Sequence, residues 1–294
     1  MEQLVIFIKQ LINGIQVGSI YALVALGYTM VYGIVKLLNF AHGDFIMVGA
    51  YISLFAIMAG MPIWVAAIIA VVLCSLLGVL TERVAYKPLR NSPKLSVLIT
   101  AIAVSLLLEN LFLLLFTSTP KPYPEAISLP SIMVGPVQIS GTTLATIAIS
   151  AVTMAALQFF VKKTRMGKAM RAVSEDSQAA VLMGVNVNTT ISLTFAIGSG
   201  LAAIAAVMYC TAYPLVEPYM GSMLGLKAFI AAVLGGIGII PGAMLGGLVI
   251  GLVESLAKAY ISSTMADAVV FGILILVLLV KPTGIFGKNV GEKV

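Results

Sequence analysis

The sequence predicts an all-α fold, a polytopic bundle of about eight transmembrane helices with a discontinuous or re-entrant glycine-rich segment. Hydrophobic residues make up 61% of the 294 residues and charged residues 10%, whereas roughly 25% of a soluble domain is charged. Apolar runs of about 20 residues, the length that crosses a hydrocarbon core, recur along nearly the whole chain. These runs lack two-residue alternation, which excludes a transmembrane barrel.

The predicted spans follow one another with short polar connections. In chain order they cover residues 4–33, 44–59, 62–80, 95–116, 142–161 and 190–212. A glycine-rich stretch, 224–256, is too long for one span and slightly short for two, and 268–280 is short but strongly apolar. The first run is too long for the apolar part of a signal peptide and lacks a small-residue cleavage site, so we expect it to be a span of the mature protein.

Basic residues indicate the orientation. They cluster in two connections and the C-terminal tail: Arg83, Lys87, Arg90 and Lys94; Lys162, Lys163, Arg165, Lys168 and Arg171; Lys281, Lys288 and Lys293. The positive-inside tendency places these groups in the cytoplasm. The proline-rich connection 117–141 and the segment 213–221 then face outward. The C-terminus is predicted to be cytoplasmic, and parity of the spans puts the N-terminus outside.

The loop 162–188 is about twice as long as the other cytoplasmic connection. Within it, we expect Ser174 to cap a short helix that carries Glu175 and Asp176 in its first turn and ends at Gly184. Residues 179–183 are Ala, Ala, Val, Leu and Met, an apolar surface that has no apparent function if it is exposed to water. Two explanations remain open from the residues alone: a docking surface for a cytoplasmic protein, or an amphipathic helix that rests on the bilayer.

A polar break, Asn39-Phe40-Ala41-His42-Gly43-Asp44, separates the first two spans and contains the only histidine of the chain. Such a break can mark a discontinuous helix whose free backbone groups line a substrate path. It can equally be an interfacial turn in which Asn39 ends one helix, Gly43 allows the bend and Asp44 caps the next.

The predicted spans contain few ionisable side chains, and each can have either a functional or a structural role. Glu109 and Asn110, in the fourth span, are either a pore or subunit-interface pair or a buried polar pair that stabilises helix packing. Glu254 lies four residues before Lys258, in the order that favours an ion pair along a helix. Cys74 and Cys210 lie in apolar segments, so we predict no disulfide, and no residue cluster predicts a metal site or a catalytic centre.

The glycines of 224–256 predict close helix packing. Gly242 with Gly246 and Gly247 with Gly251 form four-residue repeats of small residues, which let helices approach closely. A phosphate-binding loop is excluded because no lysine followed by serine or threonine completes it. We expect Pro241 to divide the stretch into two half-spans, or alternatively into two short full spans.

Several segments resemble a known family. The run Gln178-Ala179-Ala180-Val181-Leu182-Met183-Gly184 resembles the Glu-Ala-Ala, three residues, Gly signature of ABC importer permeases, with Gln178 in place of the glutamate. The break 39–44 with the preceding residues 21–33 is similar to the N-terminal region of the branched-chain amino-acid ABC transporter permease family. The segments 227–229, 231–238, 241–243 and 281–284 resemble the same family.

This resemblance implies a single transmembrane permease domain, 1–294, with a cytoplasmic coupling loop at 162–188. In the family the short helix of this loop contacts the ATPase subunit, which implies a coupling role for Ser174, Glu175, Asp176, Gln178, Ala179, Ala180, Leu182, Met183 and Gly184. The candidate translocation path comprises Asn39, His42, Gly43, Asp44, Glu109 and Asn110. Such permeases are not enzymes and hold no cofactor, because ATP and Mg are bound by partner subunits.

The resemblance also implies the assembly and its location. The expected partners are a second permease subunit, related or identical, two cytoplasmic ATPase subunits, and an extracytoplasmic binding protein that delivers leucine, isoleucine or valine. The expected location is the bacterial inner membrane, in contact with lipid and with no nucleic acid. The alternative function is an ion-coupled secondary transporter or channel, which would use Glu109, Asp44 and His42 as coupling groups.

Overall fold

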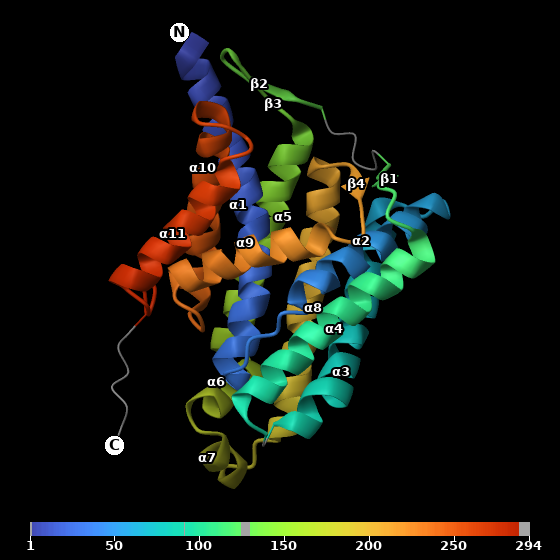
Figure 1. Ribbon diagram of the computed structural model, residues 1–294, viewed down its shortest axis with the longest axis vertical. Helices are drawn as coiled ribbons and strands as arrows, with labels where there is room; N and C mark the ends of the chain where they lie inside the picture. Colours follow the sequence, from blue (N-terminus) through green and yellow to red (C-terminus); the bar gives the residue numbers. More distant parts are fainter. Residues whose placement is uncertain (1, 91, 125–129, 288–294) are drawn as a thin grey trace.

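The computed structural model describes residues 2–90, 92–124 and 130–287, and it confirms the predicted all-α bundle (Figure 1). The α-helices are α1 Glu2–Val35, α2 His42–Met58, α3 Ile63–Thr81, α4 Lys94–Phe116, α5 Gly141–Lys163, α6 Arg165–Glu175, α7 Ser177–Leu182, α8 Val187–Ala212, α9 Met220–Gly235, α10 Ile240–Tyr260 and α11 Ala266–Val280. A π-helix, η1 Glu82–Tyr86, and a 3₁₀ helix, η2 Lys87–Leu89, continue α3. The strands are β1 Lys121–Pro122, β2 Ile132–Val134, β3 Val137–Ile139 and β4 Leu215–Val216.

Six helices of the described chain are long and apolar enough to cross a membrane: α1, α3 with its continuation, α4, α5, α8 and α10. Three others, α2, α9 and α11, are apolar but shorter. The division of 224–256 differs from the expected one. Pro241 lies in the first turn of α10, and the chain breaks at 236–239, where Gly236 and Gly238 have φ of 102° and 94°. The result is one short helix, α9, and one full-length helix, α10.

The helix α3 agrees with the predicted span 62–80, but the helical path continues beyond it. Residues 82–89 were expected in a loop because they include Glu82, Arg83 and Lys87, but the helical path continues through η1 and η2 to Leu89. The charged side chains are tolerated because this part of the helix reaches the polar end of the bundle. The connection to α4 is thereby reduced to residues 90–93.

The long helices pack in a reciprocal pattern. α1 lies along α10, α8 lies along α3, and α1 and α8 also contact each other in the centre of the bundle. α1 and α8 run in opposite directions, and each is followed by a short helix, α2 or α9, and then by a long one. This is the arrangement of two inverted-topology repeats, a common architecture of transporters.

Glycines permit the closest helix approaches. A Cβ atom on Gly247 would lie 2.4 Å from the backbone nitrogen of Ala22, and one on Gly251 would lie 2.2 Å from that of Gly18, both on α1. Two other glycines of α10 approach the neighbouring helix α9. A Cβ on Gly246 would lie 2.0 Å from the backbone oxygen of Ala231, and a Cβ on Gly242 would lie 2.3 Å from that of Gly235. The four predicted packing glycines therefore occupy two faces of α10, toward α1 and toward α9.

The molecule has two distinct ends. One carries the start of α1 and the β2–β3 hairpin, and we call it the hairpin end (Figure 1). The short β1–β4 ribbon packs near it, where the buried Tyr123 hydroxyl donates to Ser53 at 3.2 Å, and burial raises the pKa of this hydroxyl to about 12. The opposite end carries α6, α7 and the α3–α4 connection, and we call it the α7 end.

Candidate functional site

The break between α1 and α2 turns the chain back into the bundle. Lys36 adopts a left-handed conformation, φ 56°, directly after the end of α1. The chain then rises beside α1, so that α2 begins at His42 against Gly27, where a Cβ atom would lie 2.2 Å from His42 Nε2. The imidazole, 1% exposed, packs edge-on against Tyr28 with ring centroids 4.6 Å apart. α2 therefore starts among the packed helices and not at the surface of the bundle.

The first turn of α9 meets the first turn of α2 at this point. A Cβ on Gly43 would lie 2.6 Å from the Gly221 oxygen, and a Cβ on Gly221 would lie 2.3 Å from the Gly43 oxygen. Only glycine at both positions allows the two helices to begin so close together. Two helix N-termini, each the positive end of a helix dipole, thus converge inside the bundle.

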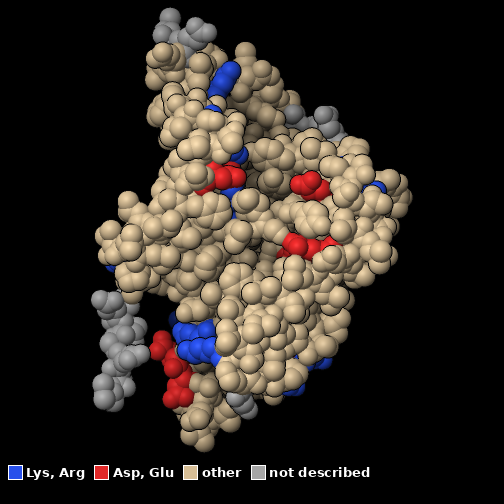
Figure 2. All heavy atoms as spheres, viewed as in Figure 1, with Lys and Arg blue, Asp and Glu red and all other residues tan. Residues whose placement is uncertain are grey.

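A cleft of about 260 Å³ lies beside these N-termini. Its polar lining consists of Asp44 and Ser222 from the two first turns, Ser105 and Glu109 from α4, and Tyr28 from α1. Ser222 Oγ donates to Glu109. The apolar lining comes from Phe40, Ile102, Leu106 and Leu226. In Figure 2, the acidic groups on the right stand among uncharged side chains, whereas those on the left and at the bottom lie beside basic groups.

Asp44 is the exceptional residue of this cleft. Its side chain is 1% exposed, and neither carboxylate oxygen has a hydrogen-bond partner among the described residues. A buried carboxylate in a membrane segment is costly unless it is paired or contacts water. Its place in the first turn of α2 offsets only part of this cost through the helix dipole. Such a residue is a candidate for binding a positively charged group of a solute.

The structure separates the six predicted path residues into three groups. Gly43, Asp44 and Glu109 line the cleft. Asn39 and His42 lie behind it, where Asn39 Oδ1 accepts from the Tyr86 hydroxyl at 2.7 Å. The Asn110 side chain is exposed on α4 and donates to the Leu106 oxygen one turn earlier at 2.7 Å.

At the α7 end, the loop 162–188 folds into α6, α7 and their caps. Asp176 Oδ1 accepts from the backbone nitrogens of Gln178 and Ala179 at 2.8 and 3.0 Å, so Asp176 caps α7. The prediction that Ser174 caps this helix is wrong: Ser174 lies in the last turn of α6 and donates to the Arg171 oxygen. Gly184, with φ 80°, ends the helix as predicted.

The surface of α7 is apolar and exposed. Leu182 and Met183 are 87% and 84% exposed, and Val181 is 57% exposed, whereas Ala180 is buried against the rest of the chain. Gln178 and Ala179 are also exposed. The helix projects from the bottom of the molecule in Figure 1. The predicted basic connections 83–94 and 162–171 surround the same end, while Lys288 and Lys293 lie outside the described residues.

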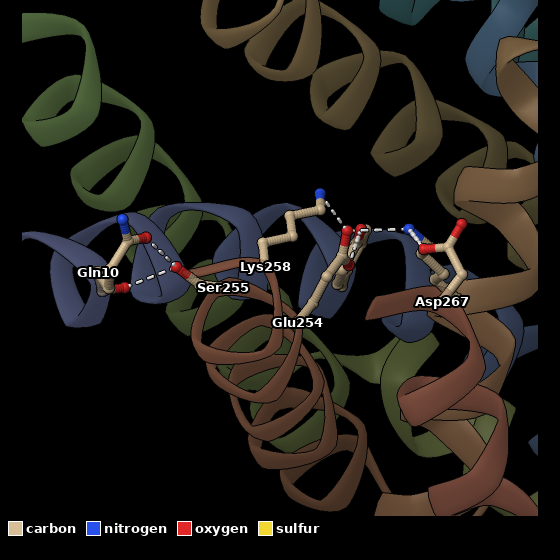
Figure 3. A network of polar contacts seen from close by, with 7 residues as sticks. Gln10, Glu254, Ser255, Lys258 and Asp267 are labelled. Atoms are coloured by element: carbon tan, nitrogen blue, oxygen red, sulfur yellow. Dashed lines mark hydrogen bonds and ion pairs between the residues drawn. The ribbon is translucent and has the colours of Figure 1, made fainter. Parts of the chain in front are cut away.

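A charged network near the hairpin end was only partly predicted. Lys258 Nζ lies 2.6 Å from Glu254 Oε1, which confirms the predicted pair. Lys227 on α9 also reaches Glu254, at 2.9 Å, and Asp267 on α11, at 2.7 Å. The Tyr21 hydroxyl of α1 donates to Glu254 at 2.5 Å. Figure 3 shows this network beside the Gln10–Ser255 contact between α1 and α10.

Comparison with known proteins identifies the family. Residues 10–279 match the family described as branched-chain amino acid transport system / permease component. The chain belongs to this family. The predicted family is thereby confirmed, and so is the role of permease subunit of an ABC importer.

Two bacterial relatives match this permease over its full length. It is 45% identical over 312 residues to the high-affinity branched-chain amino acid transport system permease protein LivH of Escherichia coli strain K12, with 100% of this chain and 99% of that one covered. It is 44% identical over 309 residues to the corresponding permease protein BraD of Pseudomonas aeruginosa strain PAO1, with 100% of both chains covered. A probable branched-chain amino acid transport permease protein of Methanocaldococcus jannaschii is 28% identical over 299 residues, covering 96% and 93%.

Proposed function

We propose that this permease carries branched-chain amino acids across the inner membrane by alternating access, driven by two cytoplasmic ATPase subunits, one of which docks on α7. A second permease subunit, an extracytoplasmic binding protein and Mg-ATP on the ATPases complete the proposed assembly. The relatives that bear branched-chain amino acid transport names support the substrate class. In this proposal the α7 end and the C-terminus are cytoplasmic, and the hairpin end with the N-terminus faces outward.

The observation that carries the proposal is the exposed apolar surface of α7. A helix of six residues is too short to be stable alone in water, yet here it is capped at both ends and held outside the bundle. Its exposed Leu182 and Met183 would be unfavourable in water, which favours coverage by another protein. The basic residues around it favour the cytoplasmic side, where the ATPases are.

The cleft suggests how an amino acid would be recognised. Its carboxylates, Asp44 and Glu109, offer partners for an ammonium group, and the α2 and α9 N-termini favour a carboxylate. The apolar lining side chains, such as Ile102 and Leu226, suit a branched aliphatic group. We propose that the second permease subunit covers this cleft.

The test uses the complete complex, co-expressed with its ATPase subunits and purified in detergent. Met183→Asp places a charge on α7, and Met133→Asp is the matched control, because Met133 is 69% exposed on the hairpin at the other end. We expect Met183→Asp to reduce the amount of ATPase that co-purifies and Met133→Asp to leave it unchanged. Equal co-purification of both variants would reject the docking role of α7. Import by the permease alone down an ion gradient in liposomes would reject the ATP-driven mechanism.

A further inference from the structure

A polar network ties the first turns of α8 to the α3–α4 connection. Glu82, whose side chain is fully buried, accepts from Arg90 and, through Oε2, from Ser192 Oγ at 2.6 Å. Arg90 Nη1 also donates to Asn188 Oδ1 at 2.6 Å. Two polar side chains of α8, Asn188 and Ser192, are thus attached to one partly buried ion pair.

The same connection is bonded to the loop before α2. Tyr86, four residues after Glu82 and 2% exposed, donates its hydroxyl to Asn39 Oδ1 at 2.7 Å. The backbone oxygen of the same residue, Asn39, accepts from the backbone nitrogen of His42 at 3.1 Å. A displacement of Tyr86 therefore acts on the turn that sets the start of α2 and the position of Asp44.

α8 is closely linked to α7. The turn after α7 is closed by the Gly184 nitrogen on the Val181 oxygen at 2.9 Å and the Val185 nitrogen on the Ala180 oxygen at 3.0 Å. Asn186 then caps α8 through the Thr189 nitrogen at 3.1 Å. With every connecting residue held by a hydrogen bond, a force on α7 is passed to the base of α8.

The apolar side chains around this network form their own cluster, distinct from the main core. The cluster joins the last turns of α1, η1, α4 and the first turns of α8 through Val31, Tyr86, Val97, Ala101, Ile191 and Phe195. It also contains a π-helix turn, closed by the Lys87 nitrogen on the Glu82 oxygen. π-helix turns occur often at functional sites, because a shift of one residue in their hydrogen bonds is available.

We propose that Glu82, Arg90, Tyr86 and Asn39 are positioning residues that transmit movement of α7, through Ser192 and Asn188 of α8, to the α2 N-terminus and its Asp44. The proposal rests on the proposed function, in which the ATPases act on α7. None of the relay residues touches the solute or ATP in this mechanism. Their removal is therefore expected to uncouple the two processes without preventing either.

The test measures ATP hydrolysis and leucine import on the same proteoliposomes, reconstituted with the full complex and its binding protein. Tyr86→Phe removes one hydroxyl and keeps the ring against Phe195, whose centroid is 5.4 Å away. We expect leucine imported per ATP hydrolysed to fall about tenfold, within the usual range of coupling between sites, with ATPase binding unchanged. Tyr260→Phe is the control, because Tyr260 is the last residue of α10, is 59% exposed and is not part of the relay.

Further variants separate a relay from a merely structural role. Ser192→Ala should reduce the same ratio and Ser192→Thr, which keeps the hydroxyl, should restore it. Combined with Tyr86→Phe, Ser192→Ala should add little, since both interrupt one path. If Tyr86→Phe does not assemble, Arg90→Lys replaces it, because a lysine keeps the charge but cannot hold Glu82 and Asn188 together.

Two failures are distinguishable. The relay is overturned, and the proposed function is left intact, if the ratio of leucine imported to ATP hydrolysed is that of the wild type in both Tyr86→Phe and Ser192→Ala. Where Arg90→Lys replaces Tyr86→Phe, the same criterion applies to it. Full additivity of the two changes would also overturn a single path. Retention of the ATPases by Met183→Asp would instead overturn the docking role of α7, whatever the relay variants do.

Discussion

Removal of Glu254 should destabilise the permease more than removal of any of its three donors. Glu254 is 2% exposed and joins α10 to α1 through Tyr21 and to α9 through Lys227. In Glu254→Ala, Lys227 stays buried but keeps Asp267 at 2.7 Å. Breaking a buried ion pair costs about 3–5 kcal/mol, and the remaining contact favours the lower figure.

The comparison variant is Lys258→Ala. Its ammonium group lies 2.6 Å from the same carboxylate, but the side chain is 44% exposed, so the pair is worth about 0.5 kcal/mol. At about 2–4 °C per kcal/mol, Glu254→Ala should lower Tm by about 6–12 °C and Lys258→Ala by about 1–2 °C. Adding Lys227→Met to Glu254→Ala should recover part of the loss, because the buried ammonium group is removed and the Asp267 carboxylate, 40% exposed, stays in contact with water.

The two native cysteines allow Tm to be measured without adding a labelling site. Cys74 and Cys210 are free and fully buried, so a thiol-reactive fluorophore reports unfolding in detergent. The reasoning is refuted if Glu254→Ala and Lys258→Ala lower Tm equally, or if the double variant Lys227→Met/Glu254→Ala is less stable than Glu254→Ala alone. Either result would mean that the network does not carry the α1–α9–α10 contact.

Three more outcomes are expected. Gly247→Ala should cost about 1–3 kcal/mol or more by overpacking against the Ala22 backbone, measured as Tm, whereas Gly272→Ala on α11 has open space and should not destabilise. Asp176→Ala should lose about 1 kcal/mol of helix cap and weaken ATPase binding in a pull-down, and Asp176→Asn should retain both. Asp44→Asn should abolish leucine import in proteoliposomes without lowering Tm; wild-type import would contradict a role in the path.

Local signals in the sequence were sufficient for the bundle and for its two ends. Apolar length predicts a span regardless of what packs against it, and clustered basic residues identify one end in the same way. The short helices α2 and α9 lack that length, so their beginnings inside the bundle could not be read from hydropathy. The Gly43–Gly221 contact joins residues 178 positions apart, and no local pattern predicts it.

Two errors share a physical origin, a choice between competing local options. Ser174 and Asp176 are both good helix caps, but the residues before Ser174 form the amphipathic helix α6, and the carboxylate then caps α7. Residues 82–89 are polar enough for a loop. They remain helical because the buried Glu82 accepts hydrogen bonds from Arg90 and Ser192. The Lys227–Asp267 pair could have been suspected, since a lysine inside an apolar run needs a counter-ion.

The four buried carboxylates, Asp44, Glu82, Glu109 and Glu254, differ in a way that bears on function. Glu109 accepts a hydrogen bond from Ser222. Glu254 accepts from three donors and Glu82 from two, so the fold explains why they are kept. Asp44 has no hydrogen-bond partner on either oxygen among the described residues, and a neutral asparagine of the same shape would avoid the cost of burying its charge. Its charge therefore opposes stability in this conformation. A residue that destabilises one state must be favoured in another, or by a bound cation such as an ammonium group, and the cleft beside Asp44 has room for one.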